Sequence, residues 1–148
     1  MKLPEARKIL RLSPLFFFGA LLLSRVATPD YLFFDEVHYV PAAKQLVLGL
    51  ENLNWVHPPL AKFILGCAWL LFTKTLGLVG EPQVFRLTTA VFGLACLWCV
   101  QLWMETLKFR PRAAAAATWL TGFNFLWFVM SKTVMLDVFF TAFALYGL

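Results

Sequence analysis

Two adjacent carboxylic acids, Asp35 and Glu36, lie just after the first apolar segment of the chain, and His57-Pro58-Pro59-Leu60 follows later in the same loop. A carboxylate beside a reacting hydroxyl can accept its proton, and basic side chains can hold phosphate oxygens. Charged groups are costly to keep beside a bilayer, because removing their water costs free energy. The spacing therefore favours a reaction site over a packing feature.

The composition identifies the solvent of the chain as a lipid bilayer. The chain is 61% hydrophobic and 14% charged, whereas a soluble domain is about half apolar and a quarter charged. Its net charge of +5 comes from short basic clusters beside apolar segments, which suits membrane orientation and excludes a nucleic-acid partner. Three cysteines inside apolar stretches are interpreted as small apolar side chains: Cys67, Cys96 and Cys99.

Apolar runs between polar stretches predict the membrane segments. We expect transmembrane helices at 9–28, 84–107 and 113–130, and the start of another at 138–148. Residues 29–83 are expected to form an outer loop that carries two surface helices. Because the last segment is short for a span, we expect the 148 residues to be the N-terminal part of a longer protein.

The outer loop decides the topology. Pro41 near the start and Gly49 near the end predict an amphipathic helix over 40–50. A second helix is expected over 58–78, on the surface, because Lys62 and Lys74 leave too short an apolar run to span. The positive-inside rule agrees, since it then places both basic clusters in the cytoplasm: Lys2, Arg7, Lys8, Arg11, Lys108, Arg110 and Arg112.

This topology collects the ionisable side chains at one membrane boundary, where a lipid-linked phosphate would present its head to water. The candidates are Asp35, Glu36, His38, His57, Arg86, Lys132 and Asp137. The sequence has no closely spaced set of metal ligands, so it does not establish a requirement for a divalent metal.

Each candidate has a structural alternative. Asp35 could cap the following helix, and His57 could be a loop residue held extended by the prolines. Arg86 could mark a helix end, and Lys132 with Asp137 could form a weak surface ion pair. Trp55, Trp69 and Tyr39 fit an aromatic belt at the interface better than a sugar-binding platform.

Three motifs stand out in this order: Phe34-Asp35-Glu36-Val37-His38-Tyr39, Val56-His57-Pro58-Pro59-Leu60-Ala61-Lys62 and Ser131-Lys132-Thr133-Val134-Met135-Leu136-Asp137. Together they resemble the protein O-mannosyltransferase family and, more broadly, the integral-membrane glycosyltransferases of the GT-C type. The resemblance covers roughly residues 7–148 and implies an all-α GT-C transmembrane module with juxtamembrane helices in its first outer loop. This sequence departs from relatives in three places: Lys132 replaces arginine, His57 replaces the lysine of aminoarabinose transferases, and Val56 replaces a metal-binding glutamate.

The resemblance also implies a reaction. The donor would be a polyprenyl-phosphate-linked hexose, mannose by analogy, and the acceptor a hydroxyl of protein serine or threonine or of a glycan, with inversion at the anomeric carbon. Asp35 would be the general base and Glu36 would orient Arg86, His57 or a backbone donor. His57, Arg86, Lys132 and Asp137 would bind substrate or phosphate, and this N-terminal part would be inactive alone.

Two other function classes stay open at this stage. A transporter or flippase would move a lipid-linked substrate without breaking a bond, and an assembly subunit would do no chemistry. For all three we expect a multi-pass protein of a bacterial plasma membrane or the endoplasmic reticulum, in contact with membrane lipids. The predicted site lies on the non-cytoplasmic side.

Overall fold

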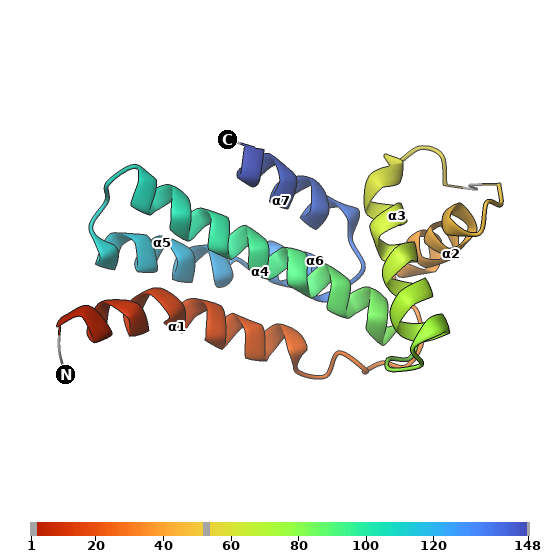
Figure 1. The fold of residues 1–148 in the computed structure, drawn as a ribbon, viewed down its shortest axis with the longest axis horizontal. Helices are drawn as coiled ribbons and strands as arrows, with labels where there is room; N and C mark the ends of the chain where they lie inside the picture. Colours follow the sequence, from red (N-terminus) through yellow and green to blue (C-terminus); the bar gives the residue numbers. More distant parts are fainter. Residues whose placement is uncertain (1–2, 52–53, 148) are drawn as a thin grey trace.

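The computed structural model describes the backbone of residues 3–51 and 54–147, with side chains from residue 9 onward in those ranges. Within this part every regular element is a helix and no strand occurs (Figure 1), which confirms the all-α prediction. The elements in chain order are α1 (Leu3–Leu23), α2 (Glu36–Val47), α3 (Pro59–Ala68), the π-helix η1 (Trp69–Thr75), α4 (Gln83–Thr106), α5 (Pro111–Gly122), α6 (Phe125–Lys132) and α7 (Leu136–Gly147).

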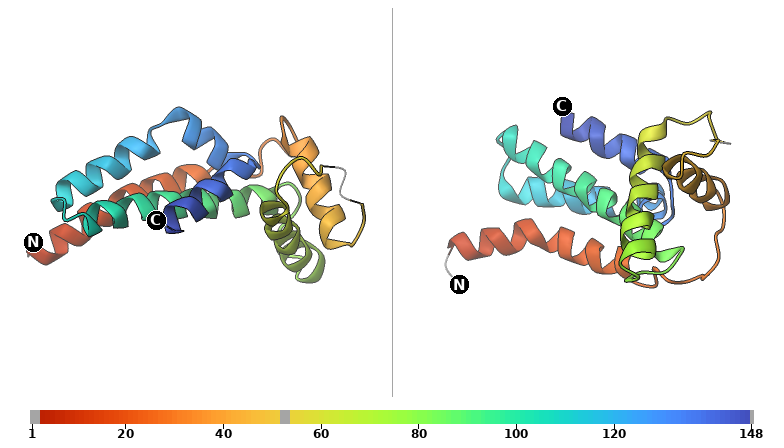
Figure 2. Two further views of the ribbon diagram at one scale, coloured as in Figure 1. Left: turned by 90° about the horizontal axis from the view of Figure 1, so that it is seen from above. Right: turned by 45° about the vertical axis from the view of Figure 1, so that its right-hand side comes forward.

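The long helices run side by side, and the two loop helices gather at one end of them. Figure 1 shows α1, α4 and α5 roughly parallel, with α2 and α3 at the end where α4 begins. The two further views keep this arrangement (Figure 2), and α3 lies across the end of the bundle rather than along it. The N-terminus and the α4–α5 turn lie at the opposite end, where Arg11 Nε and Glu105 Oε1 are 3.0 Å apart.

Helix α2 begins earlier than the predicted segment 40–50. Its first residue is Glu36, so Pro41 lies inside the helix and not in its first turn. The start is set by backbone amides of His38 and Tyr39, which both donate to the carbonyl of Asp35 at 3.0 Å. Proline here removes one N–H from the helix, a cost that the buried face of α2 must offset.

The predicted second surface helix, 58–78, is found as α3 continuing into η1. Two residues predicted for an aromatic belt behave differently from the third. Trp55 is 81% exposed, but Trp69 and Tyr39 are buried in the core at this end of the molecule, so the belt prediction is wrong for them.

One helix in the described residues, α4, is long and apolar enough to cross a membrane. It matches the predicted span 84–107 closely. The helix predicted over 9–28 ends earlier than expected. Helix α1 stops at Leu23, and the chain then turns at Arg25, which has φ 54°. The apolar parts Ile9–Leu23 and Leu136–Gly147 are both shorter than a full span.

The predicted continuous helix 113–130 is wrong. Helices α5 and α6 meet at a 66° bend, and they provide a second crossing only as one broken span. Asn124 causes the break, because it leaves the helical conformation and its side chain accepts a hydrogen bond from Trp127 N at 2.9 Å. This is the N-cap interaction for which Asn is favoured.

The core that supports this end of the molecule lies between α2, α3, α4 and the start of α7. Its buried members are Tyr39, Val40, Ala43, Ala61, Leu65, Trp69, Val84, Phe85, Val134, Leu136 and Phe139. Gly66 lets α3 approach α2 closely, since a Cβ there would lie 2.5 Å from the backbone oxygen of Ala43.

Replacing Gly66 by alanine should therefore destabilise the packing of α3 on α2 by about 1–3 kcal/mol, because the added methyl meets a backbone atom that cannot rotate away. Gly19→Ala is the matched control, since a Cβ there meets only Leu94 side-chain atoms at 3.7–3.8 Å. Thermal unfolding in detergent should show a loss for Gly66→Ala and none for Gly19→Ala. Equal stability of the two variants would contradict the close approach.

Candidate functional site

A buried ion pair joins the two halves of the predicted site. Glu36 is 0% and Arg86 2% exposed. The guanidinium donates from Nε to Glu36 Oε1 at 2.9 Å and from Nη2 to Oε2 at 2.7 Å, which is the forked geometry of strong arginine–carboxylate pairs. Glu36 therefore contacts Arg86, one of the partners considered for it from the sequence.

Arg86 donates its remaining hydrogen bonds to the chain that follows α1. Nη1 donates to the carbonyls of Val26 at 3.3 Å and Pro29 at 2.6 Å, and Nη2 donates to that of Tyr31 at 2.8 Å. A guanidinium has five N–H donors, so none is left for a phosphate. This geometry contradicts the predicted phosphate-binding role, and Arg86 instead positions the loop.

Glu36 is equally saturated. Oε1 also accepts from Val134 N at 3.2 Å, and Oε2 accepts from Phe33 N at 3.4 Å. With the two bonds from Arg86 these occupy the roughly four lone-pair sites of a carboxylate. Glu36 is therefore a positioning residue rather than a proton acceptor. It fixes its neighbour Asp35 and the turn that leads to Asp137.

Asp35 lies at the N-terminal end of α2, but its side chain makes no capping hydrogen bond. The capping alternative is therefore not realised in this structure. Its φ of −71° and ψ of −13° are helical. The side chains of Asp35 and Glu36 therefore diverge by one helical step of about 100°. The preceding Phe34 is in the left-handed region with φ 53°.

Tyr39 brings the remaining acidic groups together. Burial raises the pKa of its hydroxyl, and the charges of Asp35, one helical turn earlier, and of Asp137 raise it further. His57 Nε2 is 3.4 Å from the Tyr39 oxygen, and the two rings meet edge to face at 5.3 Å. We call these four residues the carboxylate site: Asp35, Tyr39, His57 and Asp137.

Sequence reasoning missed Tyr39 because an aromatic residue near a membrane segment is typical of the interface. The available signal was the spacing of four from Asp35, which places two residues on one face of a helix. His57 is exposed, and the chain before it is held by buried Lys62, whose Nζ donates to the carbonyl of Asn54. Burial lowers the pKa of Lys62.

An apolar groove begins at the carboxylate site. It has a volume of about 420 Å³ and lies between the start of α3 and α7. His57 and Asp137 are its polar members, and the rest of its lining is Pro58, Leu60, Ala61, Leu136, Phe139, Phe140 and Phe143. The groove is therefore polar at one end and aromatic along α7, as a site for an amphiphilic molecule would be.

Lys132 lies outside this groove. It forms no ion pair with Asp137, the predicted alternative, because its Nζ donates to Leu21 O at 3.1 Å and Ser24 Oγ at 3.3 Å. It lines another cavity, together with Arg25 and Arg86. The structure thus brings together Asp35, His57 and Asp137 but places Lys132 apart. His38 is exposed on α2.

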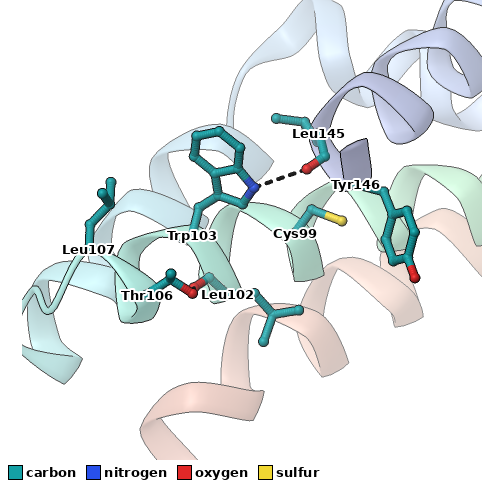
Figure 3. A pocket seen from close by; sticks show the side chains of 7 residues that line it. All are labelled: Cys99, Leu102, Trp103, Thr106, Leu107, Leu145 and Tyr146. Carbon is teal, nitrogen blue, oxygen red and sulfur yellow. Dashed lines mark hydrogen bonds between the residues drawn. The ribbon is translucent and has the colours of Figure 1, made fainter. Parts of the chain in front are cut away.

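A third cavity lies near the opposite end, between α4 and α7 (Figure 3). Its volume is about 320 Å³, and Trp103 Nε1 there donates to the carbonyl of Leu145 at 2.9 Å. The lining has no acidic or basic side chain, so we place no reaction there. Among the described residues, no group of three or more His, Cys, Asp or Glu side chains could hold a metal ion.

No family model, curated protein or solved structure matches this chain. The resemblance to protein O-mannosyltransferases therefore stays a prediction from the three motifs.

Glu36→Gln should lower the free energy of unfolding by about 3–5 kcal/mol, because it leaves the Arg86 charge buried without its partner. Arg86→Met should do the same, and the double variant should lose less than the sum, since neither charge is then stranded. Denaturant unfolding in detergent measures all three. Arg11→Gln is the control, because the half-buried Arg11–Glu105 pair at the opposite end is expected to contribute about 0–1 kcal/mol.

Tyr39 should ionise above its ordinary pKa of 10.0, since burial and two carboxylates disfavour the tyrosinate. The folded chain therefore binds this proton more tightly than the unfolded chain does. The free energy of unfolding falls as the pH rises from about 10 through the raised pKa. Tyrosinate absorbance in a Tyr31→Phe/Tyr146→Phe variant isolates this residue, because the chain has 3 tyrosines. Asp35→Asn should bring the pKa back toward 10.0, and titration at 10.0 or below in the parent would contradict this environment.

Proposed function

We propose that this protein is an integral-membrane glycosyltransferase that uses a polyprenyl-phosphate-linked sugar as its donor. The observation that carries the proposal is an apolar groove whose two polar lining residues, His57 and Asp137, belong to the carboxylate site. A polyprenyl-phosphate sugar has the same two parts, an apolar chain and a polar head. A groove with aromatic walls can hold the chain while the head reaches groups that can move a proton.

The proposal includes a multi-pass arrangement of GT-C type, with the carboxylate site at the non-cytoplasmic face of a bacterial plasma membrane or the endoplasmic reticulum. In it α4 crosses the membrane, α1 and the bent pair α5–α6 cross beside it, and α7 enters it. The distribution of charge supports this orientation, because Lys108 and Arg110 in the α4–α5 turn and Arg112 at the start of α5 lie at the end opposite the site. The orientation of α3 across the bundle also agrees with it.

The proposed reaction is an inverting displacement at the anomeric carbon. The acceptor oxygen forms a bond to that carbon while the bond from the carbon to the phosphate oxygen breaks. The acceptor proton passes to the carboxylate of Asp35, and the polyprenyl phosphate leaves as an anion. Because the phosphate departs already charged, the leaving group needs little help from an acid. The main demands are a base, alignment of the two substrates and stabilisation of positive charge on the sugar.

The other residues of the site have supporting roles in this proposal. His57, at the mouth of the groove, holds a phosphate oxygen of the carrier. Asp137 faces the same space from α7 and stabilises the positive charge that develops on the sugar. Tyr39 is protonated at neutral pH, since its pKa lies above the ordinary value of 10.0, so its hydroxyl can orient His57. Glu36 and Arg86 hold the backbone that presents Asp35.

The resemblance adds the identity of the substrates to the proposal. It implies mannose as the sugar and serine or threonine of a protein as the acceptor. Lipids and glycans are acceptors for other enzymes of the broader class. The proposed reaction does not depend on a divalent metal being bound or absent. No nucleic acid has a role in this chemistry.

Asp35→Asn in the full-length protein should lower sugar transfer by about 10²–10⁴-fold, because the amide cannot accept the proton. Unfolding should be unchanged, since the Asp35 side chain makes no cap hydrogen bond. The measurement is product formation from a radiolabelled polyprenyl-phosphate mannose and a serine- and threonine-rich peptide. Asp30→Asn is the control, because Asp30 is an exposed acid in the same loop.

Three other outcomes overturn parts of the proposal. Full transfer by Asp35→Asn removes Asp35 as the base. Movement of the labelled lipid across a vesicle membrane without cleavage indicates a transporter. Neither transfer nor movement, with normal assembly of a larger complex, indicates a non-catalytic subunit.

A further inference from the structure

The cavity that contains Lys132 is separate from the apolar groove and has the opposite charge. We call it the cationic cavity. It has a volume of about 220 Å³, and its lining is Arg25, Val26, Thr28, Phe33, Arg86, Phe128, Val129, Lys132 and Thr133. None of these described residues is acidic, so the cavity holds cationic side chains without a carboxylate in its wall.

Of the three cations that line the cavity, Arg25 and Lys132 have N–H groups that can bind a ligand, and Arg86 has none. The Arg86 guanidinium is neutralised by Glu36 and its five donors are used within the chain. Lys132 Nζ makes two hydrogen bonds, both to the end of α1, which leaves one of its three N–H groups. Arg25 is exposed and lies close enough to Lys132 for their charges to repel. An anion between them would relieve this repulsion.

Arg25 has an unusual backbone conformation, and Lys132 is held by the residues around it. Arg25 has φ 54°, in the left-handed region that a residue with a side chain rarely adopts. Lys132 is anchored by the Leu21 carbonyl, one of the last carbonyls of α1. Its ammonium also lies over the Phe128 ring, 5.6 Å from the ring centre. A strained residue and an anchored ammonium facing one space are typical of a binding site rather than of freely solvated side chains.

The rest of the surroundings are apolar and open. Val26, Phe128 and Val129 line the cavity. Leu23 next to it is 49% exposed, and Phe125 and Leu126 on α6 are 79% and 64% exposed. The cavity is smaller than the roughly 300–1,000 Å³ of a drug-sized site, so it would take a headgroup while the attached chains lie along the exposed apolar surface.

We infer that the cationic cavity binds the phosphate headgroup of an anionic membrane lipid, held by the Arg25 guanidinium and the Lys132 ammonium. The guanidinium can donate two parallel hydrogen bonds to phosphate, and the ammonium adds a point charge. This inference does not rest on the proposed sugar transfer, because it uses no residue of the carboxylate site. Bound lipid would fasten the end of α1 to α6.

The test measures lipid binding directly. The purified protein in detergent is titrated with phosphatidylglycerol or with phosphatidylcholine, and bound lipid is counted by native mass spectrometry. The parent should retain phosphatidylglycerol in preference to phosphatidylcholine. Arg25→Gln should weaken that retention about fivefold, the effect expected of one cation near a membrane surface. Arg110→Gln, an exposed arginine at the opposite end, is the matched control and should bind as the parent does.

Lys132 provides a second variant pair. Lys132→Gln should weaken retention of phosphatidylglycerol, whereas Lys132→Arg should keep it because the charge is preserved. Arg25 is exposed, so Arg25→Gln tests the site even where Lys132→Gln disturbs the end of α1. Equal retention by Arg25→Gln and Arg110→Gln overturns the inference, as does equal retention of the two lipids. Displacement of the lipid by inorganic phosphate at the same concentration overturns the assignment to a lipid, since the apolar surroundings would then add nothing.

Discussion

The buried ion pair between Glu36 and Arg86 is the constraint on which both the fold and the candidate site depend. A charge taken out of water is tolerated only when it is paired and its hydrogen bonds are made. Here the pair and its partners connect the chain after α1, the start of α2, helix α4 and the turn before α7. These segments are far apart in sequence, so one interaction between them decides how this end of the bundle closes.

The pair also separates charges of opposite sign. Asp35 and Asp137 lie near Tyr39, whereas Arg25 and Lys132 line a different cavity. If Arg86 were unpaired, its charge would attract the free carboxylates, since charges interact strongly where water is excluded. Saturated by Glu36, it adds no net charge to either region. Acidic and basic side chains can therefore exist in one small structure without neutralising each other.

Local patterns in the sequence predicted local structure well. An uninterrupted apolar run predicted 84–107, and α4 spans Gln83–Thr106. Prediction failed where a single polar residue or a distant partner determines the local structure. Asn124 is an example, because it interrupts the helix inside an apolar run. The pair Asp35-Glu36 was recognisable, but which acid is saturated depends on Arg86, fifty residues later. No local pattern shows which of the two acids is saturated. The place of Tyr39 in the carboxylate site likewise depends on tertiary contacts.

The backbone before α2 explains how two neighbouring acids reach different environments. Phe34 has φ 53°, in the left-handed region, which costs a residue with a side chain about 1–2 kcal/mol. The hydrogen bonds of Glu36 offset that cost, and one of them comes from Phe33 N, next to the strained residue. Because successive side chains on a helix diverge by about 100°, anchoring Glu36 inside the protein turns Asp35 away from it. The strain and the ion pair therefore act together: one carboxylate is saturated, and its neighbour keeps the lone pairs that a base needs.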